Sequence, residues 1–178
     1  MKKIPLIVVM ISITGLVSAQ YLPFSEGASV LFTIKNFGFD VTGKFSGIHG
    51  KIDFDPLNTS NARFDIIVDA GSINTDNGLR DQHLKGEDYF DVAEHPDIHF
   101  LSTGISPGAS KGMFLLTGKL TIKNIVREIQ FPFVAIPSDG GYIFKGSFKM
   151  RRKDFKVGGT STLSDELEVR LNVQAKRS

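Results

Sequence analysis

The sequence predicts an all-β fold of about eight antiparallel strands. Apolar and polar residues alternate with a period of two over several segments, which is typical of strands with one buried face. Clusters of Gly, Pro, Asn, Asp and Ser separate these segments at hairpin-scale spacing. No alternation of helical and strand segments appears, so a parallel sheet is not expected.

The strand segments follow one another along the chain. The most regular comes last, where Leu167, Val169 and Leu171 alternate with Glu168 and Arg170. Such strands either stack as a sandwich or close as a barrel, and only closure removes exposed edges. We expect strands over residues 30–35, 41–54, 62–69, 98–101, 113–122, 129–133, 142–148 and 167–175.

One segment, "NTDNGLRDQHL" at residues 74–84, interrupts the strands. Thr75 or Asp76 can cap a short helix there, and Gly86 is placed to end it. The segment therefore predicts a helix between two strands, with Leu79, His83 and Leu84 roughly on one face.

The chain opens with a segment typical of secretory signal peptides. Lys2 and Lys3 precede an uncharged apolar run from Ile4 to Val17, and small residues up to Ala19 resemble a cleavage site. The run is short for a membrane-spanning helix, so no stable membrane anchor is expected. We expect residues 1–19 to be removed and residues 20–178 to form one secreted domain.

Composition restricts the function classes. Removing the leader takes away two of the 21 Lys and Arg residues, which leaves 19 basic residues against 19 acidic ones. A neutral chain has no electrostatic reason to bind nucleic acid. The chain has no Cys, which rules out disulfides and thiolate metal sites. It has 15 Phe and no Trp, and Phe rings without a polar group favour a dry interior.

The histidines do not predict a metal site. His95 and His99 are four residues apart, but Pro96 and the strand pattern after it indicate extended chain. Four residues of strand span about 13 Å. Two imidazoles that far apart cannot both reach one zinc ion at about 2.1 Å.

Catalysis remains an alternative at this point. Asp81 and His83 could act as orienting carboxylate and base, with Ser72 or Thr75 as nucleophile. No G-x-S-x-G turn is present, and residues two apart on a helix point to different sides. A polar clasp that holds the helix over one end of the strands explains the same residues.

The segment "SINTDNGLRDQHLKGEDYFDVAEHPDIHF" at 72–100 resembles the signature segment of the YceI family. The resemblance extends to "SVLFTIKNFGFDVTGKFSGIHGKIDFD" (29–55), "LTGKLTIKNIVREIQFPF" (116–133) and "RRKDFKVG" (151–158). Three residues depart from the family pattern: Tyr89 replaces Phe, and Asn124 and Lys156 each replace Gly.

The resemblance implies an eight-stranded antiparallel lipocalin-like barrel, with a short helix capping one end. It implies a periplasmic, non-enzymatic carrier that holds a long isoprenoid lipid, of the polyprenol or quinone type, in its lumen. No cofactor is required beyond such a bound lipid or quinone, and the resemblance also admits a homodimer. The alternatives are a small-barrel enzyme acting on a lipid or quinone through His83 and Asp81, and a filled barrel serving as a stress-response interaction module.

Two sets of residues follow as candidates for the site. The polar head of the lipid is expected at the mouth, near Arg80, Asp81 and His83. The apolar lumen is expected to be lined by Val30, Phe32, Ile34, Phe64, Ile66, Leu79, Phe100, Phe131, Phe133, Phe144, Phe148, Val169 and Leu171.

Overall fold

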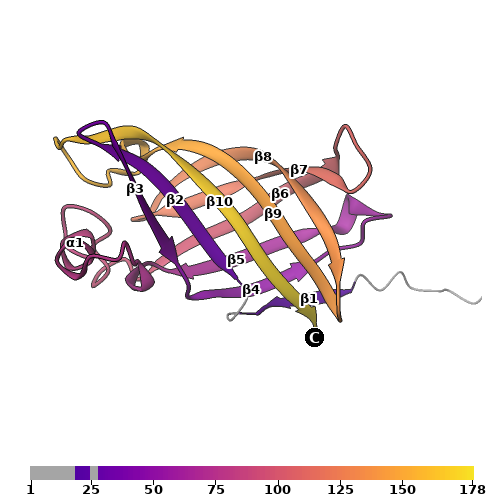
Figure 1. Cartoon of the computed structure of the whole chain (residues 1–178). Helices are drawn as coiled ribbons and strands as arrows, with labels where there is room; N and C mark the ends of the chain where they lie inside the picture. Colours follow the sequence, from indigo (N-terminus) through magenta and orange to yellow (C-terminus); the bar gives the residue numbers. More distant parts are fainter. Residues whose placement is uncertain (1–18, 25–27) are drawn as a thin grey trace, which may run out of the picture.

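The computed structural model describes residues 19–24 and 28–178 (Figure 1). The signal-peptide prediction concerns residues 1–19 and therefore falls, apart from Ala19, outside the described residues. Within the part of the chain that is described, no helix is long and apolar enough to cross a membrane.

The described residues contain ten strand segments, all paired antiparallel. Short 3₁₀ turns lie at Thr59–Asn61 (η1), Ala70–Ser72 (η2) and Arg152–Phe155 (η3), and the α-helix α1 spans Gly78–Leu84. The strands are β1 (Gln20–Pro23), β2 (Ser29–Asn36), β3 (Phe39–Phe45), β4 (Ile48–Asp53), β5 (Arg63–Asp69), β6 (Asp97–Pro107), β7 (Met113–Ile122), β8 (Ile125–Ser138), β9 (Gly141–Arg151) and β10 (Leu163–Arg177).

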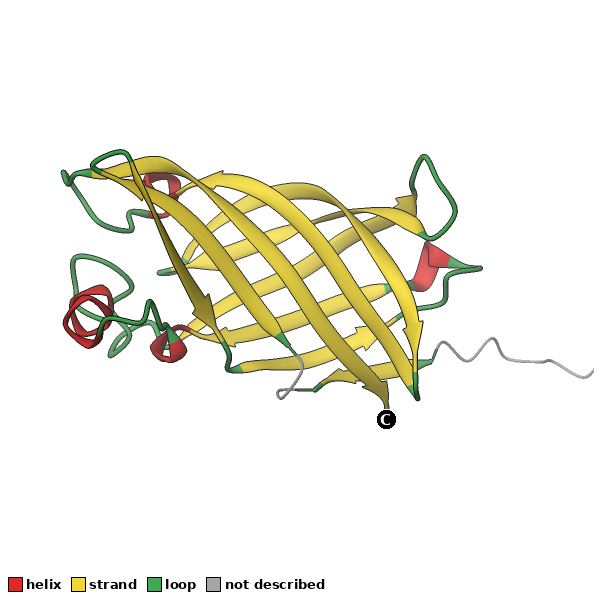
Figure 2. Cartoon of the chain, viewed as in Figure 1, coloured by secondary structure: helices red, strands yellow, loops and turns green. Residues whose placement is uncertain are grey.

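The sheet closes into an eight-stranded barrel (Figure 2), which confirms the predicted fold class. Strand β1 pairs with β4 on one side and with β10 on the other, so that Tyr21 lies opposite both Ile52 and Arg177. Strands β1 and β2 both pair with β10, so together they occupy one strand position of the barrel. Strands β3 and β4 pair with β2 and β1 and together occupy the next position. Each position therefore holds one interrupted barrel strand.

The predicted single strand at 41–54 was wrong in one respect, because it is broken at Ser46 and Gly47. The backbone N–H groups of these two residues donate to Ser72 Oγ, at 3.1 and 3.2 Å. Just before the break, Lys44 exchanges two backbone hydrogen bonds of 2.9 Å with Asn74. The segment leading into α1 thus takes the place of a neighbouring strand beside the end of β3, where β3 and β5 diverge.

Aromatic rings fill the barrel end that lies away from α1. Phe54, which is 1% exposed, packs edge-on against neighbouring rings at centroid distances of 5.2–6.1 Å. Edge-to-face packing suits the ring quadrupoles. This phenylalanine plug consists of Phe54, Phe64, Phe114, Phe133, Tyr142 and Phe144.

Helix α1 lies at the opposite end of the barrel (Figure 1). Its N-cap is Asn77, whose side-chain oxygen accepts a 3.0 Å hydrogen bond from the Arg80 N–H, and not Thr75 or Asp76 as predicted. Asp76 cannot take that role because it occupies a left-handed conformation, with φ of 57°, one residue earlier. Its own N–H donates to the Asn74 side chain at 2.7 Å.

Candidate functional site

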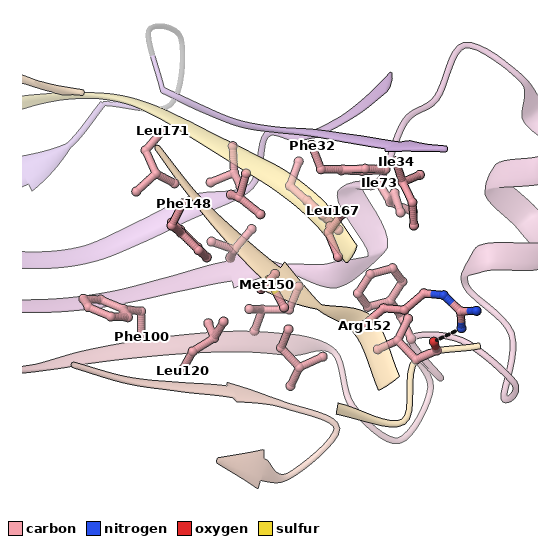
Figure 3. Close-up of a pocket in the computed structure, with 18 of the residues that line it drawn as sticks. Phe32, Ile34, Ile73, Phe100, Leu120, Phe148, Met150, Arg152, Leu167 and Leu171 are labelled. Atoms are coloured by element: carbon pink, nitrogen blue, oxygen red, sulfur yellow. Dashed lines mark hydrogen bonds between the residues drawn. The ribbon is translucent and has the colours of Figure 1, made fainter. Parts of the chain in front are cut away.

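The barrel encloses a cavity of about 370 Å³ above the phenylalanine plug. Figure 3 shows aromatic and aliphatic side chains lining this space, among them Phe32, Phe100, Phe148 and Leu171. An eight-stranded barrel is wide enough either to be filled by side chains or to hold one small ligand. The cavity volume falls in the range of small-molecule sites, about 300–1,000 Å³.

The predicted lumen residues, with one exception, lie in the wall of this cavity. They come from opposite sides of the barrel and face inward because successive side chains of a strand point to opposite faces. Whether they contact a ligand stays a prediction. The lining members are Val30, Phe32, Ile34, Phe64, Ile66, Phe100, Phe131, Phe133, Phe144, Phe148, Val169 and Leu171.

The prediction for Leu79 was wrong, because its side chain is 83% exposed. The inner face of α1 carries Arg80, His83 and Leu84, which all line the cavity. These positions are three and four residues apart and share one face of a helix. Leu79 was grouped with the inner face through its spacing to His83, but the helix is rotated so that Arg80 faces inward instead.

Sequence reasoning also missed several lining residues. Leu167 lies on a strand that the alternation had identified, so its inward direction could have been read from the same pattern. Leu120 lies on the less regular strand expected at 113–122. Ile73 lies in the connection before α1, which has no periodic pattern, and only the fold places it at the cavity.

A compact set of hydrogen bonds fixes α1 at the mouth of the cavity. Asp81 Oδ1 accepts from the N–H and the Oγ1 of the buried Thr75, at 2.9 and 2.5 Å. Arg80 Nε donates to Thr75 Oγ1 and its Nη2 to the Thr75 carbonyl, both at 2.7 Å. The polar residues of the segment thus form a clasp that ties the helix to the chain beside β3.

The three polar candidates at the mouth do not share one position. Arg80 and His83 line the cavity, whereas Asp81 is turned to Thr75 and does not. The His83 ring packs edge-on against Tyr89, with 5.0 Å between the centroids. Among the described residues, no hydrogen bond joins Asp81 to His83. Asp81 Oδ1 already accepts two hydrogen bonds from Thr75, and whether Asp81 contacts a ligand stays a prediction.

Arg152 is a further cavity residue that sequence reasoning did not single out. It is 4% exposed, and within the described chain no carboxylate lies within ion-pair distance of it. Its guanidinium instead donates to Ser161 Oγ and to the backbone carbonyls of Val157, Gly158, Gly159, Leu163 and Ser164. Figure 3 draws one of these hydrogen bonds.

His95 and His99, considered above as zinc ligands, do not line the cavity and contact different partners. His99 Nε2 lies 2.8 Å from Asp65 Oδ1, and the hydrogen bond between them lowers the pKa of the Asp65 carboxyl. His95 lies 3.9 Å from Asp91. Within residues 19–24 and 28–178, no group of three or more His, Cys, Asp or Glu is arranged to hold a metal ion.

Sequence comparison assigns the chain to a family. Residues 24–175 match the YceI-like domain. The chain belongs to the YceI family. Among its relatives is a UPF0312 protein of Pseudomonas aeruginosa, 28% identical over 170 residues, which cover 90% of this chain and 88% of that protein.

Solved structures resemble this YceI protein in fold. BcnA of Burkholderia cenocepacia superposes with a TM-score of 0.80 at 22% identity, covering 85% of this chain and 98% of that one. A polyisoprenoid binding domain from Saccharophagus degradans superposes with a TM-score of 0.72 at 12% identity, covering 91% and 100%. At these identities the likeness shows the barrel fold alone.

The departures from the YceI pattern have structural explanations. Asn124 and Lys156 have φ of 58° and 54°, the left-handed region that favours glycine. Asn tolerates that region, whereas Lys156 does so at a cost and keeps its side chain exposed, outside the cavity lining. Tyr89 lines the cavity and lies against Gly158, where a Cβ would come within 2.6 Å of the Tyr89 ring.

Asp165 connects the start of β10 to η3 on the barrel surface. Its carboxylate accepts from the backbone N–H of Lys153 at 3.0 Å and from Arg151 Nε at 2.9 Å. The Lys153 N–H, followed by Arg151, lowers the pKa of Asp165 below its ordinary value of 3.8.

This shift predicts a pH dependence of stability in this YceI protein. Because the folded-state pKa lies below the unfolded-state value, the charged carboxylate stabilises the fold above about pH 4. That contribution is lost as the pH falls through the folded-state pKa. We expect Asp165→Asn to lower the melting temperature at pH 7, and the two proteins to converge in strong acid. Circular dichroism melts from pH 7 to pH 2 measure this, and a constant difference across that range would contradict it.

Proposed function

We propose that this protein is a non-enzymatic carrier that holds part of a long-chain isoprenoid lipid, of the polyprenol or quinone type, in its barrel. The observation that carries the proposal is the cavity of about 370 Å³, whose wall is made almost entirely of aliphatic and aromatic side chains. A branched hydrocarbon chain has no polar groups to satisfy, so such a wall suits it. The fold shared with a polyisoprenoid binding domain supports the same ligand class.

The cavity size favours a terminal segment of the chain as the buried part. An engineered apolar cavity of about 150 Å³ binds benzene. By that scale the cavity here, at about 370 Å³, has room for on the order of 15 carbon atoms. The phenylalanine plug closes one end, so the remainder of a longer chain leaves through the mouth. Burying several hundred Å² of apolar ligand contributes on the order of 10 kcal/mol before ordering costs.

The polar head of the lipid is proposed to lie at the mouth. Arg80 and His83 are cavity residues there, and they supply a cationic group and an imidazole. Arg80 already donates two hydrogen bonds to Thr75, which hold its guanidinium in position. We do not assign Asp81 this role, because it does not line the cavity and its Oδ1 points to Thr75.

The direct test is organic extraction of the purified protein followed by mass spectrometry. An isoprenoid-type lipid in the extract, or stoichiometric uptake of an added prenol by lipid-free protein, is the expected result. An extract without isoprenoid, together with no uptake of a prenol or a quinone, would overturn the proposal. We further propose export through the leader at 1–19, so the exported protein should begin at Gln20 when its N-terminus is sequenced.

A filled cavity should weaken prenol uptake. Leu171 lines the cavity from β10, and Leu171→Trp places a larger side chain in that space. We expect prenol binding to weaken by at least about tenfold, because the hydrocarbon can no longer occupy the same volume. Isothermal titration calorimetry measures the affinity of the native protein and of the variant.

Leu31→Trp is the matched control. Leu31 lies opposite Arg170 on the outer face, next to Leu171 in register, and is exposed. The same substitution there leaves the cavity unchanged, so prenol affinity should match that of the native protein. Equal affinities in both variants would show that the ligand binds elsewhere.

A further inference from the structure

The hairpin that joins β2 to β3 has an unusual residue at its tip. Phe37 and Gly38 form a two-residue turn with φ of 50° and 84°, and Asn36 pairs with Phe39 on either side of it. Two positive φ angles are the mark of a type I′ turn, in which Asn, Asp or Gly is favoured at the first position. A bulky residue there is strained. Turn geometry therefore does not explain Phe37.

Exposure does not explain the tip either. The side chains of Phe37 and Phe39 are 74% and 77% exposed, although Phe has no polar group to offer water. Directly behind them, Lys35 Nζ and Asp40 Oδ1 pair at 2.9 Å and neutralise one another. The tip thus presents two apolar rings without net charge.

The hairpin tip belongs to the rim of the cavity. Asn36 lines the cavity, and its side-chain oxygen accepts a 2.6 Å hydrogen bond from Thr162 Oγ1, another lining residue. Helix α1, which carries the exposed Leu79, lies at the same end of the barrel as the hairpin (Figure 1). Three exposed apolar side chains, those of Phe37, Phe39 and Leu79, therefore lie at the end where a ligand would enter.

We propose that the tip of the β2–β3 hairpin docks this end of the barrel on a lipid bilayer, with Phe37 and Phe39 inserted among the lipids. The proposal rests on the proposed function, because the isoprenoid would then pass between the bilayer and the mouth without crossing water. An aromatic ring is suited to the boundary between headgroups and hydrocarbon, where apolar side chains anchor peripheral proteins.

The exposed area favours a bilayer over a second copy of the chain. Two aromatic side chains offer at most about 500 Å² when fully buried. A stable protein interface buries about 800 Å² on each partner. The tip is also neutral, so attachment should not need anionic lipids and should depend little on salt.

Flotation with phosphatidylcholine vesicles tests this docking. The native protein should float with the vesicles at both low and high salt. Phe37→Asn should bind them at least about tenfold more weakly, since a Phe ring no longer inserts. The same variant should also melt at a higher temperature, because Asn is favoured in this turn. A variant that gains stability while losing attachment cannot owe that loss to misfolding.

Leu57→Asn is the control. Leu57 is 94% exposed in the connection between β4 and β5, at the end away from α1. Removing this apolar side chain should leave flotation unchanged. If Phe37→Asn floats as well as the native protein, the docking proposal is overturned. It is also overturned if the native protein does not float with the vesicles. Sedimentation showing that Phe37→Asn converts a dimer to a monomer would then mean that a second copy covers the tip.

Uptake of farnesol separates this proposal from the proposed function. Phe37→Asn should take up dissolved farnesol with native affinity but extract it from vesicles several-fold more slowly. Native protein that floats with vesicles but binds no farnesol from either source would support the docking and count against the carrier function. Equal rates of extraction by both proteins would overturn the docking alone.

Discussion

Replacing Arg152 with methionine is expected to lower the free energy of unfolding by about 3–5 kcal/mol. The guanidinium is buried and donates to five backbone carbonyls between Val157 and Ser164. Val157 and Gly158 are themselves buried, so their carbonyls would lose a partner without gaining water. Each such group costs about 1–3 kcal/mol. Arg152 thus organises the connection between η3 and β10 that forms part of the mouth.

Urea unfolding of three variants measures this effect. The free energy of unfolding of Arg152→Lys should fall between those of Arg152→Met and the native protein. A lysine ammonium keeps the charge but cannot reach all the carbonyls that the planar guanidinium reaches. Arg151→Met is the matched control, since Arg151 is exposed and pairs with Asp165 on the surface. Its loss should stay below about 1 kcal/mol. A change of that small size for Arg152→Met would contradict the assigned role.

Truncating Phe54 to alanine is expected to cost about 3–5 kcal/mol. Phe54 is the centre of the phenylalanine plug, where five aromatic side chains pack edge-on around it. The surrounding rings belong to four different strands and the plug cannot collapse without moving them, so a void remains. The variant therefore loses both the transfer free energy of the ring and its contacts.

Chemical unfolding of Phe54→Ala beside Phe39→Ala isolates the effect of burial. The substitution is the same, but Phe39 is exposed, so its removal should change the free energy of unfolding by less than about 0.5 kcal/mol. If the carrier function holds, the affinity for a longer prenol, divided by the affinity for farnesol, should be higher in Phe54→Ala than in the native protein. The reason is that the cavity gains depth. Similar stabilities for the two variants would show that the plug does not hold the barrel end together.

Local patterns predicted much of the fold. The alternation at 142–148 and 167–175 identified strands that the structure extends to 141–151 and 163–177, with Phe144, Phe148, Val169 and Leu171 facing inward. This succeeded because the direction of a strand side chain depends only on its position along the strand. Closure into a barrel did not follow from the alternation, which suits a sandwich equally well, and came from the resemblance to the YceI family.

The misplaced residues share a cause. The break at Ser46 and Gly47 depends on the Ser72 hydroxyl, 25 or more residues away in the chain. The rotation of α1, which exposes Leu79 and turns Asp81 from the cavity, depends on contacts of Arg80 and Asp81 with Thr75. No periodic pattern encodes such contacts, because they depend on individual side-chain hydrogen bonds and not on the repeat of apolar positions.

The order of amino acids alone determined which side chains of each strand share a face, since the period of two is a property of the extended backbone. It also determined that the domain carries no disulfide, because there is no cysteine. Only the tertiary structure decided that rings such as Phe54 meet at one end while Phe32, Phe100 and Phe148 leave a space in the middle. Whether facing side chains touch depends on the barrel radius and on which residues oppose one another across it, and both arise only when the last strand closes on the first.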